Sequence, residues 1–287
     1  MRETSTRRGV RRFALATRSD PARPDTHPRD PILDEDDVVV EEPLEIRIAG
    51  ETVAITMRTP GADRELVLGF LLSEGVITGL DEVASIAPCG RPGDDGYGNA
   101  VDVVPAPGAR LALERVEHVV QRGTITTSAC GICGRRSIDD LVARVSPVVS
   151  DARVPLAHLV ALGPRLLSSQ PTFRRTGGLH AAGLATPAAD GLGPVFEDVG
   201  RHNAVDKVVG SQLLARTLDA GWTTLVVSGR ASFEIVQKAV VARIPIVVSV
   251  SAPSSLAIDL SLRANMTLVG FARDDRVNVY AGAQRIV

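Results

Sequence analysis

Three short apolar stretches decide the fold class: Thr223-Thr-Leu-Val-Val-Ser228, Ile244-Pro-Ile-Val-Val-Ser-Val250 and Met266-Thr-Leu-Val-Gly-Phe271. Each has the length and the β-branched content of a buried strand. Residues 232–242 and 254–262, which separate them, have helical patterns. Strands that alternate with helices predict a largely parallel sheet with helices on its faces.

The same alternation extends upstream and downstream of these stretches. We expect strands at 179–185, 195–198 and 276–280 and a helix at 203–214. The sequence therefore predicts an α/β domain at residues 137–287, with a helix beginning at the candidate N-cap Ser137.

The part from residue 36 to residue 123 has the pattern of a smaller α+β domain. Apolar and polar residues alternate on both sides of Gly50-Glu51, which is typical of a β-hairpin. The expected elements are strands at 45–48, 53–57, 100–104 and 110–113, a helix at 64–74 and a loop at 91–98. Residues 1–35 are rich in Arg, Asp and Pro without an apolar period, so a disordered tail is expected there.

The bulk properties exclude several classes of protein. The net charge is −2 and aromatic residues make up 3% of the chain, so neither a basic surface nor base stacking favours a nucleic-acid partner. No apolar run reaches the roughly 18 residues that a membrane span needs. Three cysteines are too few for a disulfide framework. We therefore expect a globular cytoplasmic protein.

The most reactive feature is the pair Cys130-Gly-Ile-Cys133, which we place in a mobile loop at residues 124–136. Arg135, Arg136 and the helix expected after them would stabilise a thiolate. The pair could carry sulfur as a persulfide, cycle as a dithiol oxidoreductase, or form half of a zinc site in a non-catalytic zinc- or nucleotide-binding module. Tetrahedral zinc needs four ligands, and the chain has no second CxxC pair, so we expect no metal.

Polar and aromatic residues lie at or just beyond the ends of the three apolar strands. They are Ser228, Arg230, Ser251, Phe271 and Arg273. Because ligands of open α/β sheets bind beyond the carboxyl ends of the strands, we expect these residues to converge around a phosphorylated, ring-bearing ligand such as a nucleotide. The chain has no Walker P-loop and no GxGxxG fingerprint, so ordinary ATP or NAD chemistry has no support.

Two further segments carry ionisable groups. His180 follows a glycine pair, and either a hydrogen-bonded histidine or a ligand contact fits it; Ala182 stands where zinc deaminases carry their catalytic glutamate. In the segment from Glu197 to Lys207, the polar residues either cap and solvate a helix, or Arg201 and His202 bind an anion at its N-terminus. We favour the anion site.

These motifs, in this order, resemble the formate dehydrogenase accessory sulfurtransferases of the FdhD/NarQ family over about residues 40–287. The resemblance rests on Thr127-Ser-Ala-Cys130-Gly-Ile-Cys133-Gly, Gly178-Leu-His180-Ala-Ala, Glu197-Asp-Val-Gly-Arg201-His202-Asn-Ala-Val-Asp206-Lys207, Ser228-Gly-Arg230 with Gln237-Lys-Ala, Ser251-Ala-Pro253-Ser-Ser-Leu-Ala and Leu268-Val-Gly-Phe271.

The resemblance implies a cytidine-deaminase-like three-layer α/β fold without deaminase activity. It implies a sulfurtransferase that takes persulfide sulfur from a cysteine desulfurase. It then transfers the sulfur to the bis-molybdopterin guanine dinucleotide cofactor (Mo-bisMGD), its bound substrate, before formate dehydrogenase receives the cofactor. Cys130 matches the position of the persulfide and Cys133 that of its partner.

The cofactor-binding stretch of the family matches Phe271, Ala272, Arg273, Asp274, Asp275 and Arg276. GDP would mimic one end of the cofactor, and we expect the protein to act as a homodimer.

Overall fold

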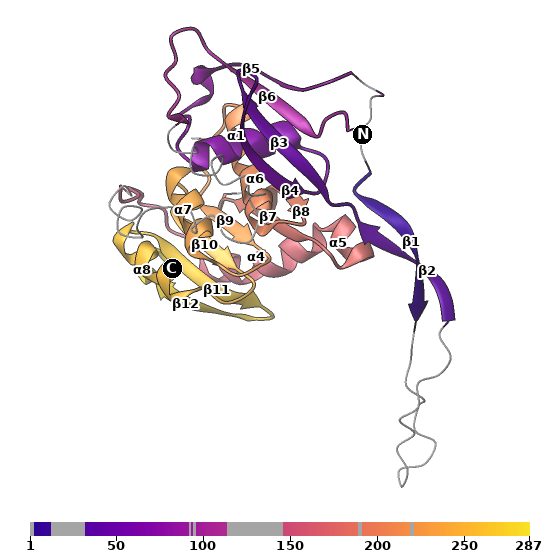
Figure 1. Cartoon of the computed structure of the whole chain (residues 1–287). Helices are drawn as coiled ribbons and strands as arrows, with labels where there is room; N and C mark the ends of the chain where they lie inside the picture. The colour runs from indigo at the N-terminus through magenta and orange to yellow at the C-terminus, as the bar shows by residue number, and fades with distance from the viewer. Residues whose placement is uncertain are drawn as a thin grey trace, which may run out of the picture.

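The computed structural model of the protein describes residues 3–12, 32–91, 93, 96–113, 146–188, 191–218 and 221–287. Its largest sheet has six strands in the order β12-β11-β10-β9-β7-β8 (Figure 1). They are β7 (His180–Ala185), β8 (Leu192–Asp198), β9 (Thr224–Val227), β10 (Ile246–Ser249), β11 (Thr267–Arg273) and β12 (Arg276–Ala281).

This sheet is mixed, so the expectation of a largely parallel sheet is wrong for its outer strands. The strands β9, β10 and β11 pair in parallel, whereas β7 runs antiparallel to β8 and β9, and β12 antiparallel to β11. The connections explain the difference. Only Asp274 and Asp275 separate β11 from β12, and so short a turn can only reverse the chain. Helices return the chain between the parallel strands.

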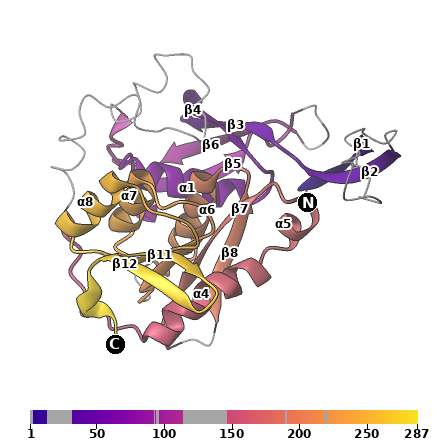
Figure 2. The same cartoon turned by 90° about the horizontal axis from the view of Figure 1, so that it is seen from below.

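Helices cover both faces of the large sheet. On one face lie α6 (Arg201–Leu214), α7 (Phe233–Val241) and α8 (Ser255–Arg263), and on the other lies α4 (Leu156–Ser168), as Figure 2 shows. Successive residues of β9 alternate between the two layers: Leu225 and Val227 belong to one hydrophobic cluster and Val226 to the other. The α/β class with three layers is therefore confirmed.

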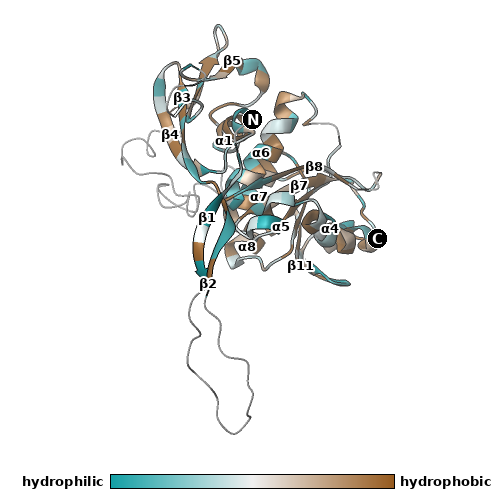
Figure 3. Cartoon of the chain, turned by 90° about the vertical axis from the view of Figure 1, so that its right-hand side faces the viewer, coloured by the Kyte–Doolittle hydropathy of each residue, from teal (hydrophilic) through white to brown (hydrophobic). Residues whose placement is uncertain are grey.

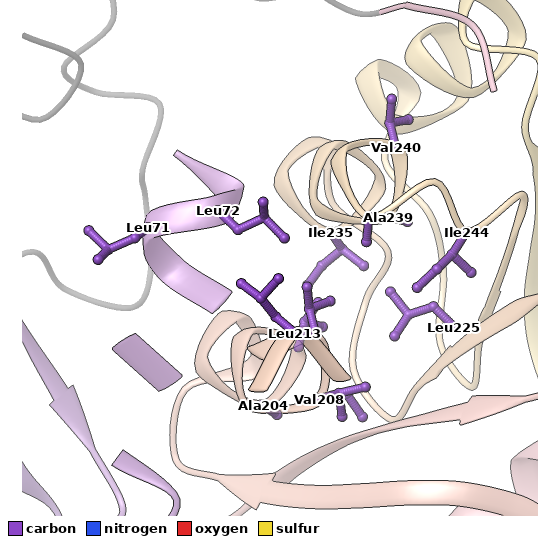
Figure 4. Packing of buried hydrophobic residues seen from close by; sticks show 14 of the residues in the cluster. Leu71, Leu72, Ala204, Val208, Leu213, Leu225, Ile235, Ala239, Val240 and Ile244 are labelled. Atoms are coloured by element: carbon purple, nitrogen blue, oxygen red, sulfur yellow. The ribbon is translucent and has the colours of Figure 1, made fainter. Parts of the chain in front are cut away.

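A second sheet has four strands in the order β4-β3-β6-β5. They are β3 (Glu42–Ile48), β4 (Glu51–Arg58), β5 (Val83–Pro88) and β6 (Ala100–Pro105). The expected hairpin, β3 with β4, is confirmed. One hydrophobic cluster runs from this small sheet into the large one, because it contains Leu44 and Val103 as well as Leu225. Figure 4 shows where side chains of α1 (Asp63–Ser73), α6 and α7 meet in it.

Helices α1 and α6 cross in direct backbone contact, because glycine lies at the crossing. A Cβ atom on Gly69 of α1 would lie 2.0 Å from the carbonyl oxygen of Asp206 on α6. No side chain fits in that space, so the small sheet and the large sheet are held close together through this pair of helices.

The amino-terminal segment differs from the sequence expectation. Instead of a disordered tail over the whole of residues 1–35, the structure has an antiparallel ribbon of β1 (Ser5–Arg12) and β2 (Ile32–Val39), which extends from the body (Figure 1). The domain boundary expected at residue 36 falls inside β2. Charge explains the pairing, since β1 carries four arginines and β2 four acidic residues. Arg7 pairs with Glu35, and Arg12 with Asp34. The ribbon is hydrophilic over most of its length (Figure 3).

Four further differences concern single elements. The helices α4 and α5 (Pro171–Thr176) were not expected, and neither was β5. Residues 110–113 form no strand; they are held by the hydrogen bond from the Ala112 amide to the Val76 carbonyl oxygen and by Leu111, which packs against the hydrophobic cluster. The short 3-10 helices η1 (Leu80–Glu82) and η4 (Ala283–Arg285) complete the described elements.

Candidate functional site

The loops that follow β9 and β10 converge with the bulged end of β11 at one edge of the large sheet, where the sequence predicts that strand ends meet. Ser249 at the end of β10 ties them together. Its Oγ lies 2.7 Å from the carbonyl oxygen of Gly229 and 3.0 Å from that of Ser251, and it accepts a hydrogen bond from the Ser251 amide. The amide of Phe271 in turn donates to the carbonyl oxygen of Ser251 (3.0 Å). Sequence reasoning missed Ser249 as the residue that joins the loops.

His180 lies at the same edge, because β7 runs antiparallel to β9 and begins where β9 ends. A Cβ atom on Gly229 would lie 3.2 Å from Nδ1 of His180 and 3.7 Å from Cδ of Arg201. Because Gly229 has no side chain, the loop after β9 can lie close to the start of β7 at His180 and to the start of α6 at Arg201. Ser228 closes the contact: its Oγ accepts a hydrogen bond from the Ala181 amide at 2.9 Å. The strand-end site, as we call it, comprises His180, Arg201, Ser228, Arg230, Ser251, Phe271 and Arg273.

The strand-end site is electropositive. Burial lowers the pKa of His180 below its ordinary value, and the neighbouring side chains of Arg201, His202 and Arg230 lower it further, against an opposing effect of Asp198. Arg201 and Arg230 supply fixed positive charge. The Nε atom of Arg201 is buried, and within the described structure it has no hydrogen-bond partner. This arrangement can bind an anion such as a diphosphate group.

Phe271 and Arg273 add an aromatic ring and a third arginine. The guanidinium carbon of Arg273 lies 5.5 Å from the ring centroid of Phe271, a cation–π contact. Phe271 has a φ of 54°, which side chains rarely adopt, at the bulge where β11 loses register with β12. The bulge turns the backbone so that consecutive residues do not follow the usual alternation.

The remaining residues of the predicted cofactor-binding stretch differ in burial. Ala272 is fully buried in the core beneath α4, where a Cβ atom on Gly163 would lie 1.8 Å from its carbonyl oxygen. Asp274, Asp275 and Arg276 are exposed at the turn between β11 and β12. Within this stretch the amide of Phe271 is bonded to a converging loop through Ser251, and the exposed Arg273 contacts the ring of Phe271.

His202 points toward α7. Its Nε2 atom lies 2.9 Å from Oε2 of Glu234 and 3.3 Å from Oγ of Ser232, and the residue is 7% exposed. The imidazole thus connects the start of α6 with the start of α7. Sequence reasoning missed Glu234, which no local pattern distinguishes from an ordinary acidic residue in a first helical turn.

Asn203, Asp206 and Lys207 do not solvate α6; each is at most 5% exposed. Lys207 pairs with Asp198 at 2.6 Å, and Asp206 pairs with Lys238 at 2.6 Å. The alternative that these three residues face solvent is therefore wrong. The surrounding apolar residues of α6 were the available signal, because a charge in an apolar helix requires a buried partner.

The predicted sulfur-carrying residues, Cys130 and Cys133, lie outside the described residues, as do Ser137 and the boundaries of the 124–136 loop. Cys89 is a half-buried free thiol. Within the described ranges, no three His, Cys, Asp or Glu side chains gather closely enough to hold a metal ion. None of the described helices has the length and apolar character required to cross a bilayer.

The chain matches the model of the FdhD/NarQ family over residues 39–287. It is 54% identical over 259 residues to the sulfur carrier protein FdhD of Anaeromyxobacter dehalogenans, covering 88% of each chain. It is 50% identical over 254 residues to the protein of the same name from Mycolicibacterium paratuberculosis, covering 87% of this chain and 91% of the relative.

A crystal structure of a formate dehydrogenase accessory protein from Desulfotalea psychrophila is also similar. It superimposes with a TM-score of 0.69 at 26% identity and covers 97% of this chain and 99% of the other. The fold, the order of the motifs and these relatives agree: the chain belongs to the FdhD/NarQ family.

Proposed function

We propose that the protein is a cytoplasmic sulfur carrier that supports a formate dehydrogenase. It accepts sulfur from a cysteine desulfurase as a persulfide on Cys130 and transfers it to the bis-molybdopterin guanine dinucleotide cofactor. Family membership and the sulfur carrier relatives support the first step. The observation that carries the second is the convergence of three loops, an aromatic ring and several cations at one sheet edge.

Loading follows the chemistry of thiol exchange. The Cys130 thiolate attacks the terminal sulfur of the persulfide on the desulfurase; one S–S bond forms, the donor's S–S bond breaks, and the donor cysteine leaves as a thiolate. Arg135 and Arg136 favour the attacking thiolate. Cys133 can later attack the inner sulfur on Cys130. That step forms a Cys130–Cys133 disulfide and releases the outer sulfur, reduced to sulfide, for the cofactor.

The strand-end site binds a guanine nucleotide end of the cofactor. Arg201 and Arg230 lie beside His180 and face the diphosphate, and the ring of Phe271 offers a stacking surface for the base. Free GDP contains the same end group, so it should bind at this site. We further propose that the protein acts as a homodimer.

Two measurements test this function. Intact-mass analysis after incubation with a cysteine desulfurase and cysteine should show one added sulfur atom that a reductant removes, present in the Cys89→Ala control and absent from Cys130→Ala. Calorimetry should show that GDP binds more tightly than ADP, and that Arg230→Gln weakens binding. A Cys130→Ala protein that still gains the sulfur atom would refute the relay. Equal affinity for GDP and ADP would refute the guanine site.

A further inference from the structure

Asp198, the last residue of β8, is fully buried and uses all of its acceptor capacity. Its Oδ1 accepts hydrogen bonds from the Gly200 amide at 2.8 Å and from Nδ2 of Asn203 at 3.0 Å. Its Oδ2 accepts from Nζ of Lys207 at 2.6 Å and from the Thr59 amide at 3.2 Å. A carboxylate held by four donors has one position and one orientation.

The two donors to Oδ1 lie on either side of Arg201 and His202. Gly200 precedes them and Asn203 follows them, at the first turn of α6. Fixing both ends of so short a segment fixes the residues between them. Arg201 is one of the cations of the strand-end site, and its Cδ lies 3.7 Å from the Cβ position of Gly229.

Residues 57–59 of the small domain hold the same turn through further hydrogen bonds. The carbonyl oxygen of Met57 accepts from Nδ2 of Asn203 at 2.7 Å. The carbonyl oxygen of Thr59 accepts from Nζ of Lys207 at 2.9 Å, and its Oγ1 accepts from the Val199 amide at 3.3 Å. The segment 57–59 lies at and just beyond the end of β4, so a segment far upstream in the chain holds the turn that carries Arg201.

Charge balance explains why Asp198 is paired. An unpaired carboxylate near Arg201 and His180 would repel an anionic ligand. Lys207, at 2.6 Å and 2% exposed, neutralises it within the protein interior. The pair therefore positions the turn without cancelling the positive charge at the sheet edge.

We propose that Asp198, together with Lys207 and the segment 57–59, is a positioning residue for ligand binding: it sets the place of Arg201 at the strand-end site and makes the small sheet a working part of that site. The inference rests on the proposed function for the identity of the ligand, and on the hydrogen bonds above for the geometry.

The chain offers a matched control for a purely structural role. Asp206 and Lys238 form a second buried ion pair with the same 2.6 Å separation, and Asp206 lies on the same helix. This pair joins α6 to α7, and Ser73 of α1 donates to Asp206 at 3.0 Å. Its hydrogen bonds lead to α1 and α7 and not to the turn at 200–203. Loss of either pair removes a buried ion pair, but only loss of the Asp198–Lys207 pair should displace Arg201.

The test compares the neutral double variants D198N/K207M and D206N/K238M with the wild-type protein. Calorimetry measures GDP affinity, and hydrogen exchange of the free protein measures protection at residues 199–204. D198N/K207M should bind GDP about tenfold more weakly, because the cation is no longer held in place, and should exchange faster at 199–204. D206N/K238M should leave both unchanged while lowering the melting temperature comparably.

If both variants lose GDP affinity equally, or if protection at 199–204 is unchanged in D198N/K207M, the inference is overturned. If the wild-type protein binds no GDP, the proposed ligand is wrong, and exchange at 199–204 still decides whether Asp198 holds the turn. Should D198N/K207M fail to fold, Thr59→Val removes only the acceptor for Val199, with Ser73→Ala as its control. Weaker GDP binding by Thr59→Val alone supports the inference, and equal binding by the two overturns it.

Discussion

Gly210 of α6 lies so close to Glu65 of α1 that a Cβ atom on the glycine would be 1.8 Å from the glutamate carbonyl oxygen. The obstacle is backbone, which cannot rotate away as a side chain can. The crossing of these helices therefore depends on glycine at this position, and the packing of the small sheet against α6 depends on the crossing.

Replacing this glycine should destabilise the whole protein. Gly210→Ala forces α1 and α6 apart, and we expect it to lower the free energy of unfolding by about 1–3 kcal/mol. Urea unfolding followed by circular dichroism measures the change. Gly191→Ala is the control, because a Cβ atom there has no neighbour within 4 Å. Equal stability of the two variants would contradict the role of the crossing.

Ser249→Ala should loosen the loops of the strand-end site. Ser249 is fully buried, and its loss leaves the Gly229 carbonyl and the Ser251 amide without their partner. The expected cost is about 1–3 kcal/mol of unfolding free energy, accompanied by weaker GDP binding in calorimetry. Ser261→Ala, at an equally buried serine whose hydroxyl bonds only to Ala257 within α8, should keep GDP affinity. Unchanged GDP affinity in Ser249→Ala would show that the hydrogen bonds of the Ser249 hydroxyl are not needed to hold the loops in their binding arrangement.

The pKa of His180 predicts a pH dependence with a definite sign. Because burial and neighbouring cations lower this pKa from 6.5, the unfolded chain binds a proton at a higher pH than the folded protein does. Well above pH 6.5, His180 is neutral in both states and does not change the free energy of unfolding. As the pH falls below 6.5, the unfolded chain binds a proton first, and the free energy of unfolding falls progressively.

An NMR titration of the His180 ring should give a midpoint below 6.5, and Arg201→Gln should raise it because a neighbouring cation is removed. In unfolding experiments, His180→Gln should reduce the loss of stability on acidification. A midpoint at or above the ordinary value would mean that the strand-end site is not electropositive.

Deletion of residues 1–35 should leave a protein that unfolds cooperatively. Among the residues that the structure describes, those of the ribbon belong to neither hydrophobic cluster. Its ion pairs are exposed, and such pairs contribute roughly 0–1 kcal/mol each. Calorimetric melting of the truncated protein checks this, and a deletion that also removes the buried Leu44 is the destabilised comparison. Loss of a single sharp transition in the shorter deletion would disprove the prediction.

The sulfur relay predicts that formate oxidation in cells depends on the sulfur atom of Cys130. In a strain that lacks this protein, wild type and Cys89→Ala should restore formate oxidation, whereas Cys130→Ala should not. The client enzyme should still be folded and contain metal in the Cys130→Ala strain, because only its sulfur ligand is missing. Formate oxidation at the wild-type rate with Cys130→Ala would show that the relay is not the function.

Much of the fold could be predicted from the sequence because strong local patterns agree with tertiary structure there. The strands around Leu225, Val247 and Leu268 are apolar on both faces, and helices do cover both faces. The direction of β12 follows from its short connection to β11 and could have been predicted, whereas the direction of β7 relative to β9 depends on the order of strands in the sheet. Helix α4 escaped notice because Gly163 and Pro164 lie in its interior, where both residues ordinarily oppose a helix. Its glycine is explained only by the contact with Ala272.

The residues of the candidate site that lie at the ends of apolar strands could be predicted from the sequence. Arg230 and Phe271 were identified because they follow apolar strands. The roles of Ser249, Asp198 and Thr59 were not identified, since they arise from hydrogen bonds between segments far apart in the chain. The pairing of β1 with β2 was missed for a related reason: neither strand has an apolar period, and only their opposite charges, on segments about twenty residues apart, indicate that they meet.

The separation of charge in that ribbon also governs how copies of the protein can meet. One outer edge presents the arginines of β1 and the other presents the carboxylates of β2. Two molecules that approached by the same edge would bring like charges face to face across a backbone otherwise ready to extend the sheet. Like edges of two ribbons therefore repel each other, and raised salt would weaken that repulsion, whereas the arginine edge of one ribbon and the carboxylate edge of another attract through the same charges that pair β1 with β2.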